Sequence, residues 1–171
     1  NGAGHRLYTD VLAEALTAAF GVPMGDGARM PEPLMADHWE AADMKLIPPA
    51  TAFPGWTYRP MENKGGWQCF DGLLECDRPG FEAEFEFEGQ AVGLFYQLGP
   101  ETGDLLWAVD GGGWAPVRLF DDYSDKFWRP SIRVLTQGLK PGRHRLRIQV
   151  GPERDPRSKG NQARLAGLLT Y

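Results

Sequence analysis

The most regular pattern in the chain is an alternation of apolar and acidic residues from Phe81 to Glu88, where every second residue is a glutamate. Successive side chains of an extended strand point to opposite faces of a sheet. The segment therefore predicts a strand with one buried and one solvated face. Residues 143–150 alternate in the same way: arginines and a glutamine occupy one side, and the other side holds His144, Leu146, Ile148 and Val150.

These two segments carry opposite charges on their polar sides, glutamates on one and arginines on the other. If the strands are neighbours in one sheet, the charges form a cross-strand ladder in which each pair contributes about 0.2–1 kcal/mol. If the strands lie in different sheets, the two polar faces are solvated independently. The sequence leaves both arrangements open.

Similar short segments follow one another through most of the chain, separated by turns rich in Gly, Pro and Asp. No alternation of helices and strands is visible, which disfavours a parallel sheet. The pattern predicts a mainly β fold, a jelly-roll-like antiparallel β-sandwich over residues 38–171. Its further strands are expected at residues 39–47, 66–70, 73–76, 91–97, 104–109, 114–120, 131–136 and 163–171.

The N-terminal part has a helical period instead. Apolar residues recur every three or four positions and predict an amphipathic helix over residues 3–20, with a stripe made of Leu7, Val11, Leu12, Ala15, Leu16 and Ala19. Gly21 is a natural C-terminal cap, and Pro23 prevents continuation. Residues 22–37 are rich in Gly, Pro and Met without a period, which is typical of a linker or an ordered strap.

Composition narrows the classes of function. The formal net charge is -5, which disfavours nucleic acid as a partner. No apolar run approaches the length that crosses a membrane, so no membrane partner is expected. Hydrophobic residues make up 42% of the chain, and the 22 glycines and 14 prolines suit frequent turns between short strands.

The two cysteines, Cys69 and Cys76, flank Asp71 and Gly72, a strong signal for a two-residue hairpin. In that hairpin the cysteines share a face but lie diagonally, with Cα separations of roughly 7–8 Å. A disulfide needs about 4.4–6.8 Å. Two free thiols are therefore favoured, although a shifted register would reverse this.

No complete set of catalytic residues is visible. The histidines are His5, His38 and His144, and no serine lies in a Gly-x-Ser-x-Gly or Gly-Asp-Ser block. His5 is interpreted as a residue of the helix start and His144 as a structural residue, whereas the sequence does not decide the role of His38. We predict no catalytic residue in this chain.

Metal binding has weak support. Asp121, Asp122 and Asp125 offer the oxygen ligands that calcium prefers, but their spacing does not match an EF-hand loop. They are interpreted as turn residues at the surface. We expect neither a metal nor another cofactor.

Aromatic residues give the best indication of binding, because sugars present apolar C–H faces to aromatic rings. A predicted loop over residues 119–129 holds Asp122, Tyr123, Trp128 and Arg129, and Trp56 with Tyr58 forms a second candidate. The alternative is that each tryptophan belongs to the core, as tryptophan usually does. Any site is expected on loops at an end of the sandwich or where it meets another domain.

The first sixteen residues, NGAGHRLYTDVLAEAL, resemble the last helix of SGNH/GDSL hydrolases. In that family a loop reading roughly Asp-x-x-His-Pro-Asn carries the catalytic Asp and His, and a Gly-His pair then opens the final helix. Asn1 matches the Asn of that loop, so the resemblance places the catalytic residues upstream of Asn1. It also makes residues 1–21 the terminal helix of an upstream hydrolase domain.

The remainder resembles β-sandwich domains appended to such esterases and jelly-roll modules of carbohydrate-active enzymes. The resemblance rests on GQAVGL (89–94), VDGG (109–112), LFDDY (119–123), GLKPGRHRL (138–146) and LAGLLTY (165–171). It implies a non-catalytic accessory domain, secreted or periplasmic, that docks on a carbohydrate esterase and helps to shape its glycan-ester cleft. The alternatives are an autonomous carbohydrate-binding module and a purely structural or oligomerising sandwich.

Overall fold

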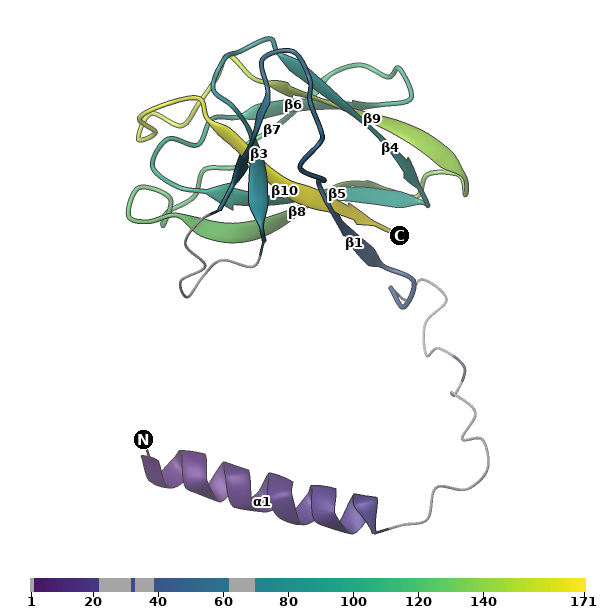
Figure 1. Ribbon diagram of the computed structural model, residues 1–171, viewed down its shortest axis with the longest axis vertical. Coiled ribbons are helices and arrows are strands. Elements are labelled where there is room, and N and C mark those ends of the chain that lie inside the picture. Colours follow the sequence, from purple (N-terminus) through teal and green to yellow (C-terminus); the bar gives the residue numbers. More distant parts are fainter. Residues whose placement is uncertain (1, 22–31, 33–38, 62–69) are drawn as a thin grey trace. The chain divides into compact units, whose positions relative to one another are not determined.

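A computed structural model describes residues 2–21, 32, 39–61 and 70–171 of the chain (Figure 1). The chain divides into two compact units, Asn1–His38 and Trp39–Tyr171. Each unit is described by itself. The predicted linker and His38 lie almost entirely outside the described residues.

The first unit contains one helix, α1 (Gly2–Phe20), which confirms the helix predicted from the apolar period. It ends where the backbone N–H of Gly21 donates to the carbonyl of Thr17 at 3.1 Å. No residue of α1 is buried, and among the described residues of this unit none covers its apolar stripe, in which Leu7 is 66% and Leu16 is 53% exposed. Among the described residues, no helix combines the length and the apolar character needed to cross a membrane.

The second unit is a sandwich of two antiparallel sheets, which confirms the predicted mainly β, jelly-roll-like fold (Figure 1). The larger sheet has the order β2-β3-β10-β5-β8, with β1 also paired to β10, and the smaller sheet has the order β4-β9-β6-β7. The strands are β1 (Asp43–Leu46), β2 (Thr57–Pro60), β3 (Gly72–Cys76), β4 (Glu82–Glu88), β5 (Ala91–Leu98), β6 (Leu105–Val109), β7 (Ala115–Val117), β8 (Arg129–Gln137), β9 (Arg143–Val150) and β10 (Ala163–Thr170).

Apolar side chains fill the space between the sheets. Leu94 of β5, Leu146 of β9 and Leu165 of β10 are all 0% exposed and belong to one cluster. A second cluster covers the outer face of the larger sheet, where Phe70, Leu73, Phe95 and Ala166 are buried against one another. The larger sheet therefore buries part of both of its faces.

The cross-strand ladder of glutamates and arginines is confirmed. β4 pairs with β9 in an antiparallel register that places Glu84 opposite Arg147 and Glu86 opposite Arg145. Arg145 Nε lies 3.3 Å from a carboxylate oxygen of Glu84. Because these side chains are largely exposed, each pair adds only about 0–1 kcal/mol. The burial of the opposite face of β9 contributes far more.

His144 is a structural residue, as the sequence indicated. Its Nδ1 lies 2.6 Å from a carboxylate oxygen of Asp110, and its Nε2 lies 2.7 Å from the carbonyl oxygen of Lys140. Asp110 and Gly111 both have positive φ, 51° and 76°, and the backbone N–H of Gly112 donates to the carbonyl of Val109 at 2.9 Å, so the two residues form a tight turn in the hairpin of β6 and β7. The imidazole thus ties this hairpin to the loop between β8 and β9.

The hairpin predicted at Asp71 and Gly72 is wrong. β3 pairs with β2 on one side and with β10 on the other, so Leu74 faces Tyr58 and Leu165 and no edge of β3 is free. Most of the strand predicted at residues 66–70, including Cys69, lies outside the described residues. Cys76 is buried, and burial raises the pKa of its thiol.

Two neighbouring residues of β9 allow the contributions of its two faces to be compared. Leu146→Ala should lower the free energy of unfolding by about 2–5 kcal/mol, because it leaves a cavity between the sheets. Arg145→Ala should lower it by less than about 1 kcal/mol, because it removes only exposed ion pairs. Urea unfolding of both variants measures the difference, and equal losses would contradict this account of the core.

Candidate functional site

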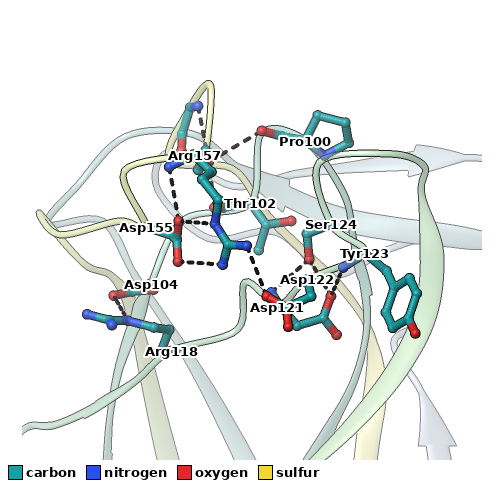
Figure 2. Close-up of polar contacts among 12 residues, drawn as sticks. Pro100, Thr102, Asp104, Arg118, Asp121, Asp122, Tyr123, Ser124, Asp155 and Arg157 are labelled. Atoms are coloured by element: carbon teal, nitrogen blue, oxygen red, sulfur yellow. Dashed lines mark hydrogen bonds and ion pairs between the residues drawn. The ribbon is translucent and has the colours of Figure 1, made fainter.

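Loops from three parts of the chain meet at one end of the sandwich, and a network of ion pairs joins two of them (Figure 2). They are the loop after β5, the loop that precedes β8 and the loop between β9 and β10. We call this network the tip cluster, and it consists of Asp121, Asp122, Tyr123, Ser124, Arg129, Asp155 and Arg157. It includes three of the residues predicted as sugar ligands.

Asp121 organises the loop before β8. One carboxylate oxygen accepts hydrogen bonds from the backbone N–H of Tyr123 and from the hydroxyl of Ser124, each at 3.0 Å. The other carboxylate oxygen forms an ion pair with Arg129. Although burial opposes the shift, these donors and Arg129 keep the pKa of Asp121 below its usual value. The ion pair between Asp121 and Arg129, the first residue of β8, thereby closes this part of the loop.

Arg157 joins this loop to the loop between β9 and β10. Its Nε and one terminal nitrogen bind both carboxylate oxygens of Asp155, at 2.9 and 3.1 Å. The other terminal nitrogen lies 3.0 Å from Asp122, and the guanidinium carbon lies 5.2 Å from the centroid of the Phe120 ring. Figure 2 shows the side chain reaching from one carboxylate to the other. A planar guanidinium suits this bridging role.

Buried polar groups support the cluster from below. The hydroxyl of Ser158 donates to the carbonyl of Thr102 at 2.8 Å, and the hydroxyl of Thr102 accepts from the backbone N–H of Gly99 at 2.8 Å. Asp104 is only 7% exposed, and burial raises the pKa of its carboxyl group despite Arg118 Nε at 3.5 Å. These hydrogen bonds connect the loop after β5 with the loop between β9 and β10, so the two loops have little freedom to move apart.

The surface of the cluster presents an aromatic ring beside a carboxylate and an amine. Tyr123 is 57% exposed (Figure 2), and the guanidinium carbon of Arg129 lies 6.0 Å from the centroid of its ring. Lys126 Nζ lies 5.3 Å from the centroid of that ring. The side chain of Asp122 is 88% exposed, and Phe127 is 44% exposed. An apolar ring with a few polar groups around it is the composition of a small-ligand site.

Trp128 and Arg129 have structural positions in the same loop. The indole of Trp128 lies directly over Gly99, where an added Cβ would come within 2.3 Å of the ring. The guanidinium of Arg164, on β10, lies 3.8 Å from the centroid of the Trp128 ring. Arg129 turns toward Asp121, and only 23% of its side chain is exposed. Neither side chain forms an open platform.

Trp56 and Tyr58 do not form the exposed pair that the sequence suggested. Trp56 is 4% exposed in the core between the sheets, and its indole N–H donates to the carbonyl of Phe81 at 3.3 Å. Tyr58, on β2, is half-buried against the same core, with its ring over Gly72. The exposure expected for Trp56 is therefore wrong, because its indole is buried between the sheets.

In the described part of the chain, three of the serine and histidine side chains are held by structural bonds. Ser124 binds Asp121, Ser158 binds Thr102, and the two ring nitrogens of His144 bind Asp110 and Lys140. His5 lies in α1. Within the same residues, no three His, Cys, Asp or Glu side chains converge as metal ligands.

The sequence analysis missed Asp155 and Arg157, which join the loops. The backbone N–H of Arg157 donates to the Asp155 carboxylate at 3.0 Å, so Asp-Pro-Arg forms an Asx turn. The Asp-Pro pair signals such a turn in the sequence. The partner of Arg157 across the fold, Asp122, lies 35 residues away and has no local signal.

Comparison with known proteins shows likeness in fold. No protein-family model matches the sequence, and no curated protein matches it. Among solved structures, the chain is similar to a two-domain esterase active on acetylated mannans that was co-crystallized with mannopentaose, with a TM-score of 0.70 and 14% identity over 99% of this chain and 46% of that chain.

A second structure of a two-domain esterase active on acetylated mannans gives a TM-score of 0.68 at 14% identity, over 99% of this chain and 47% of that one. A xanthan lyase from Paenibacillus gives 0.50 at 15% identity, over 71% of this chain and 12% of the lyase. The chain thus spans less than half the length of these esterases. At such identities the likeness shows the fold alone.

The Asp155–Arg157 pair should make stability depend on pH. Hydrogen bonds from Arg157 lower the pKa of Asp155 from 3.8 to about 2. A lowered pKa stabilises the fold above the unfolded value, and this stabilisation is lost as the pH falls through the folded value. We therefore expect the urea midpoint of Arg157→Gln to lie below that of the unchanged chain at neutral pH, with the gap closing between about pH 4 and pH 2.

Arg154→Gln, in the same loop, is the matched control and should show no such pH-dependent gap. A gap for Arg157→Gln that stays constant down to pH 2 would show that the pair does not act through the charge of Asp155.

Proposed function

We propose that the chain is the non-catalytic accessory domain of an SGNH/GDSL-type carbohydrate esterase. It docks on the hydrolase domain, and its tip cluster forms part of the cleft that binds the glycan ester. The observation that carries this proposal is the exposed ring of Tyr123, held beside Asp122 by loops that ion pairs have already fixed.

This geometry suits a sugar ring. The face of Tyr123 offers an apolar surface to sugar C–H groups, while the carboxylate of Asp122 and the ammonium of Lys126 can bind hydroxyl groups. Because the loops are bonded together before a ligand arrives, binding costs little ordering of the protein. Phe127 extends the apolar surface along the same loop.

The esterase assignment rests on the opening helix and on architecture. α1 begins at Gly2 and carries the Gly-His-x-x-Tyr opening that resembles the last helix of SGNH/GDSL hydrolases. The structures most like the chain include two-domain esterases active on acetylated mannans, which supports an acylated glycan as the substrate class. The nucleophilic serine, its histidine and the carboxylate then belong to the upstream domain.

In this division of roles, the chain supplies binding energy at a distance from the reacting carbonyl. Contacts to remote sugars raise kcat/KM for a glycan ester when the transition state keeps them. A small aryl ester has no remote sugars and gains nothing from them. The two kinds of substrate therefore separate the role of this domain from that of the catalytic groups.

We expect Tyr123→Ala, in the protein that includes the upstream domain, to lower kcat/KM on an acetylated glycan roughly tenfold, as loss of an aromatic anchor does. Its rate on a small aryl acetate should not change. Lys140→Ala, an exposed substitution in the loop between β8 and β9, is the control and should leave both rates unchanged. Equal loss on both substrates would place Tyr123 in catalysis or stability and contradict the proposal.

A second function is an autonomous carbohydrate-binding module, favoured by the exposure of Tyr123 and Phe127 within the second unit itself. Titration of the 171-residue chain with manno-oligosaccharides and other glycans distinguishes the two. An autonomous module binds a glycan without the hydrolase domain, and Tyr123→Ala abolishes that binding. An accessory domain that completes a shared cleft shows no saturable binding alone.

A further inference from the structure

The outer face of the larger sheet contains an open groove of about 310 Å³. Four strands lie side by side there, and their registers align Met44 of β1 with Leu169 of β10, Leu169 with Gly93 of β5, and Gly93 with Val134 of β8. We call this the outer groove; Trp39 and Ile132 complete its apolar walls. Gly93 contributes no side chain, so the middle of this row is hollow.

The walls of the outer groove are exposed although they are apolar. Met44 is 49% exposed, Ile132 is 61% exposed and Val134 is 45% exposed. Its polar side chains are those of Asp43 and Thr170. A glycan seated here would lose water from its hydroxyl groups and gain few hydrogen bonds in return. The groove therefore suits an apolar protein surface.

The rest of the same sheet face is already buried. Phe95 of β5 stands directly opposite Ile132 of β8 and is only 6% exposed, because it lies in the buried cluster with Phe70 and Leu73. The outer face of β4 and β9 carries ion pairs instead. A solvated sheet face would have polar residues at these positions. The outer groove is the uncovered continuation of this buried cluster.

The connection of the chain indicates which body covers the groove. Trp39, a wall of the groove, is the first residue of the second unit, and its ring lies 4.9 Å from that of Tyr171. The unit before it contains α1, whose apolar stripe is exposed and requires the rest of a domain to cover it. In the proposed function, the hydrolase domain that includes α1 is joined to Trp39 through residues 21–38, and this connection gives it a high effective concentration near the second unit.

We propose that the upstream hydrolase domain docks on the outer groove through an apolar patch of its own surface. This inference rests on the proposed function and names the surface that performs the docking. β8 links the two sites, since it runs from Arg129 in the tip cluster to Val134 in the groove, about 17 Å of strand. A domain seated on the groove and extending along β8 therefore reaches the tip cluster.

Hydroxyl-radical oxidation read by mass spectrometry tests the docking surface, with the 171-residue chain compared to the protein that includes the upstream domain. Met44 and Trp39 are both about half exposed in the chain. Because oxidation follows exposure, their oxidation rates should fall roughly fivefold or more in the longer protein. Esterase activity on an acetylated glycan is measured on the same sample.

Ile132→Glu places a carboxylate in the groove and should return the oxidation of Met44 in the longer protein to the rate of the 171-residue chain. Arg133→Glu is the matched control, because this neighbour on β8 is also exposed and alternates to the other face. It should keep Met44 protected. The urea midpoint of each variant in the 171-residue chain verifies that the sandwich still folds.

The outcomes separate the two proposals. An active esterase with unprotected Met44 overturns the docking surface and leaves the proposed function standing. Loss of protection in both variants also overturns it. In a third outcome, the protection of Met44 grows with the concentration of the 171-residue chain, and sedimentation shows a dimer. This result assigns the groove to a second copy of the chain and also overturns the proposed docking surface. An upstream domain without esterase activity removes the proposed function, and this inference with it.

Discussion

The structure depends on burying the larger sheet on both faces. Every residue of β5 is buried, although only alternate side chains point between the sheets. The inner residues contact the smaller sheet, and Phe95 on the outer side is covered by Phe70. This constraint fixes β5 and its neighbours β8 and β10 as the rigid platform from which the loops of the tip cluster extend. It also leaves the open end of the outer face with only two polar side chains, those of Asp43 and Thr170, to solvate it.

Ion pairs have different roles on the outer face of β4 and β9 and in the tip cluster. On β4 and β9, exposed ion pairs such as Arg145 with Glu84 solvate a face whose stability comes from the opposite side of the strand. In the tip cluster, Arg157 binds Asp122 and Asp155 and so fixes the spacing between the loop before β8 and the loop between β9 and β10. The ion pairs on β4 and β9 thus keep an exposed face solvated, whereas those of the tip cluster hold two loops together.

The fold was largely predictable because its signals are local. The alternation in β4 and β9 and the period of α1 each predicted the right element, and the charges on β4 and β9 even suggested their pairing. β2 was missed because Pro60 and the preceding Gly55 resemble a loop, although proline is compatible with the end of an edge strand. Pairing of β3 with β10 joins residues that are far apart in the sequence, and no local pattern encodes it.

The candidate site was predictable only in part for the same reason. Composition pointed to the loop of Tyr123, but exposure depends on partners elsewhere: Gly99 and Arg164 turn Trp128 inward. A side chain at position 99 would occupy the space of the indole, and Trp128 would have to move away. The number of aromatic rings exposed at this end of the sandwich therefore depends on Gly99, which lies under the ring of Trp128. The residue at position 99 thus decides how Trp128 packs, although it lies outside the loop that carries the indole.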